Sequence, residues 1–484
     1  MENLIHYNVS LNVQAYEILL SQLFVPTSSI NHKHQNIVEY TRQIFKIIVE
    51  YTRQIYKIIV EHTRQGEIMN HETLKRIIFD QHQVIKDAVI IDRNIVLEKN
   101  INYVLVGLRR AGKTTLLYKR VQELISEGVS WNQIIYINFD DERLLGFTVN
   151  DFDDILLVAE ELTNKKHYFY FDEIQNIDGW EKFAIRIANQ GYKVDITGSN
   201  AKMLSKEVEA KLGGRYISKE VTTYSFEEFL RANSVNKNGY SVKDIGQINS
   251  LLNDYFINGG FPESISFKNK REYISSIYQK VLYNDIIVHN NIRNENGIKL
   301  MIKKIAESVK QELSFTKIQN IITGIGYKIS KDIVIDYCGY CKDAFLLFTL
   351  ENYCASFLDK NSNPKYYFMD NGILNLFLDD KRSSLLENIV ALHLYRTHKD
   401  CLYYFKGNKA DIDFYLSELN TAIQVAYSIN EKETYEREVN NLIAFAKSNN
   451  FDSNLIIVTY EEEKTIEIDG FLIKIIPLRK FLLN

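Results

Sequence analysis

The chain has 484 residues, which is too long for one hydrophobic core and predicts roughly three domains. Apolar residues make up 45% and charged residues 25%, the proportions of a soluble globular protein rather than a membrane or disordered one. The formal net charge is -4, so the chain has no general attraction to nucleic acid or an anionic membrane, although this average leaves room for a local basic patch.

The sequence also bears on location. No apolar run approaches the ~18 residues of a membrane-spanning helix, and "MENLIHYNVS" lacks the basic start of a signal peptide. Four cysteines in a chain this long do not indicate a disulfide framework. Cys338 and Cys341 form the one close pair, whereas a zinc site usually needs two, so we expect inert thiols. We therefore predict a cytoplasmic protein without a membrane partner.

The N-terminal segment contains a tandem repeat. "IVEYTRQIFKI", "IVEYTRQIYKI" and "IVEHTRQ" begin at Ile37, Ile48 and Ile59, a period of 11 residues. Eleven residues make three helical turns, which is typical of one long helix. Repeated DNA translated upstream of a true start would give the same pattern, and Met69 opens a stretch that resembles a natural beginning. We expect residues 1–68 to be an extension that the core activity does not need.

From Tyr103 onward, short apolar runs alternate with amphipathic ones. Strands are predicted at "NYVLV", "IIYINFDD", "HYFYFDE" and "KVDITGSN", with a helix after each of the first three. Such alternation predicts a parallel sheet with helices on both faces. Active groups of such sheets lie at the carboxyl ends of the strands.

The run "GLRRAGKTT", residues 107–115, follows the first strand and opens a helix. Its glycines, lysine and threonine have the spacing G-x-x-x-x-G-K-T, which is typical of a loop whose backbone N–H groups surround phosphates. Lys113 would lie near the β- and γ-phosphates, and the Thr114 hydroxyl would ligate Mg²⁺. The predicted cofactor-binding residues are Gly107, Arg110, Ala111, Gly112, Lys113, Thr114 and Thr115.

Two adjacent acids, Asp172 and Glu173, end the third predicted strand. Neighbouring carboxylates repel unless a cation offsets their charge, and Mg²⁺ would supply it. We expect Asp172 to hold the metal, through water, and Glu173 to orient and deprotonate the attacking water.

Polar residues after the fourth strand offer further groups. Thr197, Ser199 and Asn200 are neutral side chains that could touch the γ-phosphate or position water, although small polar residues commonly end strands. Arg215 follows a Gly-Gly turn, from which an arginine could act on the nucleotide of a neighbouring copy. Most surface arginines have no such role.

Beyond Tyr224 the sequence becomes helical. Two helical stretches, "SFTKIQNIITGIG" and "SKDIVIDYCGYCKDAF", precede a hairpin-like "KYYFMD", which suggests a winged helix. The second of these stretches holds more acidic than basic residues, so protein contact is favoured over DNA reading. From Leu385 a helix, three strands, a charged helix and further strands predict a separate α/β domain.

The order "GLRRAGKTT", "HYFYFDEIQ", "DITGSN", "LGGR", "YSFEEFL" and "GGFPE" resembles bacterial and archaeal ATPases of the AAA-type superfamily that carry a C-terminal restriction-nuclease-like domain of unknown function. The resemblance covers residues 69–484 and implies ATP and Mg²⁺ as cofactors. It implies that residues 107–115 are Walker A, Asp172 and Glu173 Walker B, and Asn200 or Ser199 the sensor. It makes Arg215 an arginine finger, with a homo-oligomer as its consequence, and places the "GGFP" element near the adenine.

With the resemblance, the predicted fold class is a P-loop NTPase parallel sheet with a helical lid and a winged-helix segment, followed by a restriction-endonuclease-like α/β domain. The predicted domains are an extension at 1–68, an ATPase domain at 69–223, a lid or linker at 224–310, a winged-helix-like segment at 311–380 and a nuclease-like domain at 381–484.

The nuclease-like domain departs from its family pattern. Such nucleases use a helix acid, a strand aspartate and Glu-x-Lys on the next strand to bind metal and activate water. The matching positions are Glu387, Asp413, Gln424 and Ala426. The last two lack the carboxylate and the ammonium group, so phosphodiester cleavage is expected to be lost.

The leading hypothesis is an ATPase that acts as a conformational switch or motor. One alternative is a nucleic-acid-binding or nuclease protein under ATP control, although the net charge does not favour nucleic acid. Another is a nucleotide-gated scaffold with little turnover that binds an unidentified protein partner.

Overall fold

The computed structural model describes residues 70–356, 362–379, 382–448 and 453–483. The N-terminal repeat and Met69 lie outside the described residues, so the expected extension stays a prediction. Residues His71–Asn484 group as one compact unit. Within the described ranges, no helix combines the length and apolar character needed to cross a membrane.

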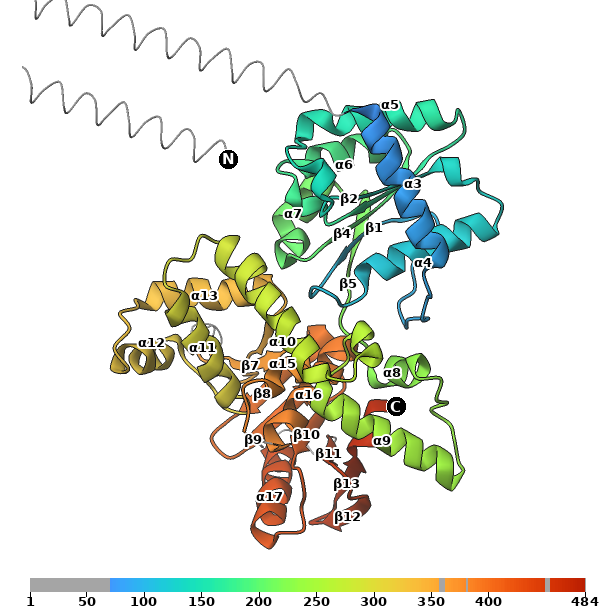
Figure 1. The fold of residues 1–484 in the computed structure, drawn as a ribbon. Helices are drawn as coiled ribbons and strands as arrows, with labels where there is room; N and C mark the ends of the chain where they lie inside the picture. Colours follow the sequence, from blue (N-terminus) through green and yellow to red (C-terminus); the bar gives the residue numbers. More distant parts are fainter. Residues whose placement is uncertain (1–69, 357–361, 380–381, 449–452, 484) are drawn as a thin grey trace, which may run out of the picture. The chain divides into compact units, whose positions relative to one another are not determined.

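Five parallel strands form the sheet that the alternating pattern predicts (Figure 1). They are β1 Asn102–Val106, β2 Ile134–Asn138, β3 Tyr168–Asp172, β4 Lys193–Gly198 and β5 Tyr216–Glu220. Their order is β2-β3-β4-β1-β5. The first four are mostly buried, as strands of a parallel sheet covered on both faces must be. This is the P-loop NTPase fold.

Helices pack around this sheet. They are α3 His71–Asp87, α4 Lys113–Ser126, α5 Phe152–Leu162, α6 Trp180–Asn189 and α7 Lys206–Leu212. The predicted helices correspond to α4, α5 and α6, whereas α3, α7 and β5 were not predicted. In α3 the buried residues include Leu74, Ile78 and Ile85, so an amphipathic stripe lies within a mostly polar sequence. Strand β5, "YISKE", lies at the edge of the sheet, and its charged residues obscure the strand pattern in the sequence.

The carboxyl ends of β1, β3 and β4 meet at one edge of the sheet. Val106 of β1 pairs with Gly198 of β4, and Phe171 of β3 pairs with Ile196 of β4. The glycine loop, the two acids and the polar residues after β4 therefore emerge side by side, as the parallel sheet requires.

The segment after β5 is helical, as predicted. Its helices are α8 Phe226–Ala232, α9 Val242–Asn258, the short helix η6 Pro262–Ser266, α10 Lys270–Lys280, the π-helix η7 Val281–Val288, α11 Glu295–Glu307, α12 Phe315–Gly324 and α13 Lys331–Asp343. The strands β6 Leu347–Leu350 and β7 Lys365–Phe368 follow these helices. The prediction lacked α11 and did not anticipate that the helix of α10 changes to π geometry.

The order of α12, α13 and the antiparallel pair β6–β7 is the one that a winged helix would have. Lys202, which lies in the turn after β4, has its Nζ 3.7 Å from Asp343 Oδ2 at the end of α13. The acidic helix thus contacts the ATPase part of the chain. The expectation that α13 makes protein contacts rather than reading DNA stays a prediction.

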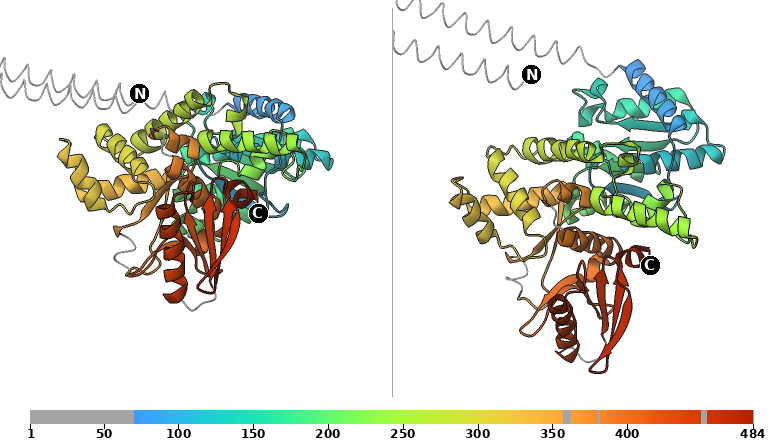
Figure 2. Two further views of the ribbon diagram at one scale, coloured as in Figure 1. Left: turned by 90° about the horizontal axis from the view of Figure 1, so that it is seen from below. Right: turned by 60° about the horizontal axis from the view of Figure 1, so that its bottom comes forward.

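A six-stranded mixed sheet forms the C-terminal part (Figure 2). Its strands are β8 Leu402–Lys406, β9 Asp411–Leu416, β10 Thr421–Val425, β11 Asn454–Thr459, β12 Lys464–Ile468 and β13 Phe471–Pro477, in the order β12-β13-β11-β10-β9-β8. The helices here are α15 Asn371–Asn375, α16 Arg382–His398, α17 Lys432–Ser448 and α18 Leu478–Leu483. Apolar residues of α17 and of β9 to β13 share one core, while α16 packs on β8 and β10.

Candidate nucleotide site

The loop between β1 and α4 has a glycine at each end, each with a positive φ. Gly107 has φ of 155°, and a Cβ there would lie 2.0 Å from the carbonyl oxygen of Val221. Gly112 has φ of 98°, and a Cβ there would lie 3.2 Å from Arg93 Nη1. L-residues rarely adopt these φ values, so the path of the backbone requires both glycines.

Lys113 begins α4 and is 3% exposed. Its Nζ donates to the carbonyl oxygens of Gly107, at 3.0 Å, and Leu108, at 3.3 Å, and lies 3.7 Å from Glu173 Oε1. The ammonium group therefore lies against the loop that its own residue closes. An anion in the loop would find a charged donor already in place.

Asp172 and Thr114 lie in direct contact. The Thr114 hydroxyl donates to Asp172 Oδ2 at 2.8 Å, and the Tyr136 hydroxyl donates to the same oxygen at 3.0 Å. Burial, followed by the charge of Glu173, raises the pKa of Asp172 to about 6. Mg²⁺ takes hard oxygen donors and keeps phosphate and water ligands as well, so one carboxylate and one hydroxyl fit this ion.

Glu173 follows β3 in a left-handed conformation, with φ of 52°. Its N–H donates to Thr197 Oγ1 at 3.0 Å, and its Oε2 accepts from Gln175 Nε2 at 2.6 Å. Burial raises the pKa of Glu173, but the charge of Lys113 and the Gln175 bond outweigh it and hold the pKa below its usual value. A non-glycine residue held at positive φ beside a buried lysine is typical of a functional position.

Ser199 and Thr197 join this group, whereas Asn200 points elsewhere. Thr197 donates to Asp172, and the Ser199 hydroxyl accepts from Gln175 Nε2 at 3.3 Å. The Asn200 Nδ2 lies 3.2 Å from His289 Nε2, just beyond η7, and its Oδ1 accepts from the Lys202 N–H. Of the two sensor candidates, Ser199 is nearer to the acids, and Asn200 links β4 to the helical segment.

Arg215 lies apart from the other predicted residues. It is exposed beyond the turn of Gly213 and Gly214, whose φ values are 59° and 70°. In the described part of the chain, no side-chain partner of Arg215 is found. The fold thus leaves this guanidinium available to another molecule, and its predicted role stays a prediction.

The other predicted loop residues hold the loop in shape. Arg110 has φ of 64°, and its Nη1 donates to Glu263 Oε1 of η6 at 2.8 Å, on the surface. The Ala111 carbonyl accepts a hydrogen bond from Arg93, and Thr115 lies in the first turn of α4.

The "GGFP" element lies over the phosphate loop. Pro262 Cγ is 3.6 Å from the position of a Cβ on Gly112. Gly259 and Gly260 are needed because Asp370 and the Tyr224 backbone occupy the space of their side chains. The expectation that this element contacts adenine stays a prediction.

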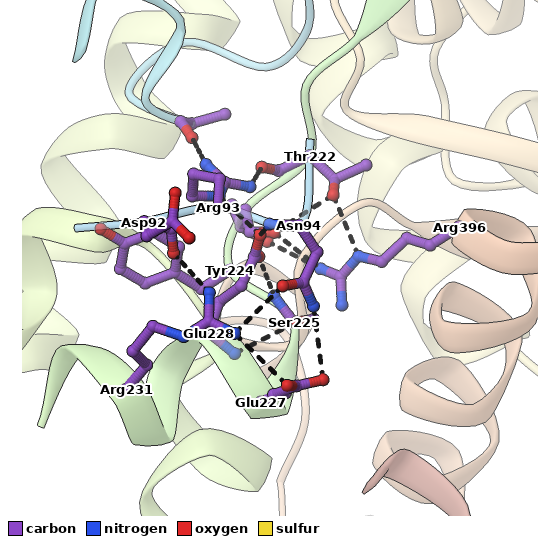
Figure 3. A network of polar contacts seen from close by, with 12 residues as sticks. Asp92, Arg93, Asn94, Thr222, Tyr224, Ser225, Glu227, Glu228, Arg231 and Arg396 are labelled. Carbon is purple, nitrogen blue, oxygen red and sulfur yellow. Dashed lines mark hydrogen bonds and ion pairs between the residues drawn. The ribbon is translucent and has the colours of Figure 1, made fainter. Parts of the chain in front are cut away.

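Arg93 is a central residue that the sequence analysis missed (Figure 3). Its Nη1 donates to the Ala111 carbonyl at 3.0 Å, its Nη2 to the Thr222 carbonyl at 2.8 Å, and its Nε to Glu228 at 2.9 Å. The Thr222 hydroxyl in turn accepts from Arg396 Nε of α16 at 3.0 Å. A continuous polar network therefore joins the phosphate loop to the C-terminal part.

The C-terminal acids gather around a second lysine that the sequence analysis missed. Lys365 of β7 has its Nζ 3.4 Å from Asp413 Oδ1 and 3.9 Å from Glu387 Oε1. Burial lowers the pKa of Lys365, but the two carboxylates more than offset this and raise it. Gln424 is tied to the backbone, since its Oε1 accepts from Asp413 N and its Nε2 donates to Asp411 O. The lysine in "PKYYF" was the available signal, because it begins an otherwise apolar strand.

A cavity of about 530 Å³ opens beside this cluster. It is lined by charged residues of both signs and by amides, among them Lys310, Lys365, Asp411, Asp413, Gln424 and Arg437. The Glu387 carboxylate lies behind the cavity wall, and burial with the Asp413 charge raises its pKa to about 7. Among the described residues, Glu387 Oε2 finds no hydrogen-bond partner.

Comparison with known families gives two matches. Residues 99–230 match the family model of an AAA domain, which spans β1 to most of α8. Residues 249–384 match a domain of unknown function, DUF8612, which runs from α9 to the start of α16. The C-terminal six-stranded sheet lies beyond both matches.

Several solved structures are similar to parts of the chain. A Walker-type ATPase of Pyrococcus abyssi has 14% identity and a TM-score of 0.38, with 61% of this chain and 99% of that chain covered. The Aeropyrum pernix ORC1 protein, solved in complex with DNA, has 14% identity and a TM-score of 0.31, with 66% and 93% covered.

Two relatives match over most of their length. An uncharacterized protein of Methanocaldococcus jannaschii is 33% identical over 428 residues, which cover 85% of this chain and 95% of that protein. An uncharacterized protein of Haemophilus influenzae is 30% identical over 382 residues, which cover 76% and 91%. The chain belongs to the family of these archaeal and bacterial proteins, and within it residues 99–230 form an AAA domain.

Proposed function

We propose that the chain binds ATP and Mg²⁺ at the loop of residues 107–115 and hydrolyses ATP to ADP and phosphate. One observation carries the proposal: Lys113, Thr114, Asp172 and Glu173 converge at the carboxyl edge of a parallel sheet. The AAA domain match supports the coarser statement that this is a P-loop ATPase domain.

Each side chain has a separate role in the proposed reaction. The Lys113 ammonium, which now donates to two loop carbonyls, would turn to the terminal phosphates and bind them. Thr114 and Asp172 would hold Mg²⁺, whose charge would offset that of the phosphates. Glu173 is held ionised by Lys113 and oriented by Gln175, so it can accept a proton from water.

Hydrolysis would change the conformation beyond the site through contacts on both sides of the loop. Arg93 binds the Ala111 carbonyl and shares Thr222 with Arg396, so a shift of the loop reaches α16. The cycle would thus act as a conformational switch. Arg215, exposed and without a partner in the described residues, is free to approach the nucleotide of a second copy, and a homo-oligomer is part of the proposal.

The test is to separate binding from turnover. We expect Glu173→Gln to keep the ATP dissociation constant and to lose turnover by about 10²–10⁴-fold, because the variant lacks the proton acceptor. Glu142→Gln, at an exposed acid between β2 and α5, is the matched control and should leave both quantities unchanged. Wild-type turnover as slow as that of Glu173→Gln, beside tight ATP binding, would instead favour a nucleotide-gated scaffold.

A second candidate function, a nucleic-acid-acting C-terminal end, is favoured by one observation. Ala426, which directly follows β10, offers no ammonium group, whereas Lys365 of β7 places one beside Asp413 and Glu387. Two carboxylates fit a divalent cation, which would offset the charge of a phosphodiester, and Lys365 would contact the same group. Gln424 is committed to backbone hydrogen bonds, so only two acids are offered.

This candidate is tested by gel shift and by cleavage of labelled DNA and RNA with Mg²⁺ or Mn²⁺, with and without ATP. Cleavage by the wild-type protein that Asp413→Asn abolishes would support it. Absence of both a shift and cleavage at low salt would dispose of it, while leaving the ATPase proposal intact.

A further inference from the structure

Arg109 of the phosphate loop is bound to the helical segment by a two-pronged ion pair. Its Nη2 lies 2.9 Å from Asp285 Oδ1, and its Nε lies 3.1 Å from Asp285 Oδ2. A third nitrogen, Nη1, lies 3.4 Å from Asp140 Oδ2. Both partners of the main pair are largely buried, with side chains 17% and 12% exposed. Such a fork fixes the guanidinium plane and is stronger than a single contact.

Asp285 lies within η7, the stretch of π-helix between α10 and α11. π-helical turns are rare and often occur at functional sites. Burial raises the pKa of Asp285, Arg109 lowers it, and the charges of Glu173 and Lys113 also act on it. The Asp285 carboxylate is therefore within electrostatic reach of both residues that would surround the terminal phosphate.

This arrangement conflicts with a bound triphosphate. A terminal phosphate beside Lys113 and Glu173 would bring negative charge toward the buried Asp285 carboxylate, and like charges in a poorly solvated site repel. Arg109 cannot present the same two N–H groups to the phosphate and to Asp285. A phosphate that binds this edge of the guanidinium therefore has to displace Asp285.

We propose that Arg109 is a phosphate-binding residue that Asp285 occupies in the absence of nucleotide, and that the γ-phosphate of ATP displaces Asp285 and releases η7 from the loop. The proposal rests on the ATP site proposed above. It assigns a second cation to the phosphate and makes the fork the point at which the helical segment detects ATP.

A second contact between the helical segment and the site supports the proposal. His289, which directly follows η7, lies 3.2 Å from Asn200 at the end of β4. The helical segment thus touches the site at both the phosphate loop and the sensor candidate. Loss of the Arg109–Asp285 fork would leave the weaker of the two contacts, because the Asn200–His289 contact is a single hydrogen bond without the paired opposite charges of the fork.

The experiment compares ATP with ADP in Asp285→Asn, which keeps the shape of the side chain and removes its charge. We expect ATP affinity to rise by on the order of tenfold, with ADP affinity changed much less. We expect Arg109→Ala to lower ATP affinity selectively. Glu295→Gln is the matched control, because Glu295 also pairs with a cation, Lys299, at 2.9 Å, but on the surface of α11, and the ATP-to-ADP preference of this variant should stay that of the wild type.

The thermal midpoint without nucleotide separates this role from a structural one. Asp285→Asn should lower the midpoint, because the fork is weakened, while ATP affinity rises; a purely structural role would lower both. Weaker or unchanged ATP binding by Asp285→Asn, when the wild-type protein binds ATP, overturns the inference and leaves the ATPase proposal standing. The inference is also overturned if the wild-type protein binds ADP and ATP with equal affinity and Arg109→Ala changes neither affinity.

Discussion

Lys113 and Lys365 are two buried lysines that each lie in a cluster of charged residues, and the two clusters differ in what surrounds the ammonium group. Lys113 and Lys365 are 3% and 4% exposed, and each lies within 4 Å of a carboxylate. The Lys113 ammonium donates mainly to carbonyl oxygens of its own loop. The Lys365 ammonium faces two carboxylates and the ring of Tyr404, whose centroid is 5.4 Å away.

The difference concerns the charge that each lysine can offer. At the phosphate loop, neutral carbonyls occupy the ammonium, so an arriving anion gains a cation that no acid fully balances. At the C-terminal cluster, Asp413 and Glu387 already offset the charge of Lys365, and a bare anion gains little. The comparison teaches that a buried lysine held by acids is a weaker indication of anion binding than one held by backbone carbonyls.

The largest expected effect concerns the acid-held lysine. We expect Lys365→Met to lower the free energy of unfolding by about 3–5 kcal/mol, because it leaves the buried Glu387 and the partly buried Asp413 without their cation. Denaturant titration measures this. Lys406→Met, at a half-exposed lysine paired with Glu312, is the control and should cost about 1 kcal/mol or less. A loss at position 365 no larger than in the control would remove the contrast between the clusters.

The next effect concerns the backbone of the loop. We expect Gly107→Ala to cost about 2–3 kcal/mol of unfolding free energy, since its Cβ would overlap the Val221 carbonyl. ATP affinity should fall with it. Gly470→Ala, at φ of 81° with nothing within 4 Å of the new Cβ, bears only the conformational cost of about 1 kcal/mol. Equal losses at the two positions would show that the loop backbone is not closely packed.

The smallest effect concerns Gln424. Its side chain bonds the Asp413 N–H and the Asp411 carbonyl, so Gln424→Ala should cost about 1–2 kcal/mol by leaving both groups without a side-chain partner. Asn441→Ala, on the wall of the same cavity, should fall within about 0.5 kcal/mol of the wild type. If Gln424→Ala leaves the free energy of unfolding unchanged, the Gln424 amide is free for another partner.

The nucleotide site could be predicted because its signals are local. Gly107 to Thr114 form one contiguous run, and Asp172 and Glu173 adjoin a strand whose apolar pattern fixes its place in the sheet. Parallel-sheet geometry then brings the carboxyl ends together without further information. The P-loop fold follows from that pattern, whereas the strand order β2-β3-β4-β1-β5 and the strand β5 were not predicted.

The rest of the site could not be predicted, because its partners are distant in sequence. Arg109 and Asp285 are separated by 176 residues, and Arg93 and Glu228 by 135. No periodicity or spacing links such pairs, and each is set by how helices pack on the sheet. Lys365 is a further case, since it lies on β7, 48 residues before Asp413 of β9, and only the packing of the two strands brings them together.

The most direct test of the central claim is a calorimetric titration of ATP with Mg²⁺ into the wild-type protein and Lys113→Ala, with Lys165→Ala, at an exposed lysine before β3, as the control. The account predicts saturable binding to the wild type and to the control, and a loss of affinity of at least about tenfold in Lys113→Ala. Equal dissociation constants for all three proteins would contradict it.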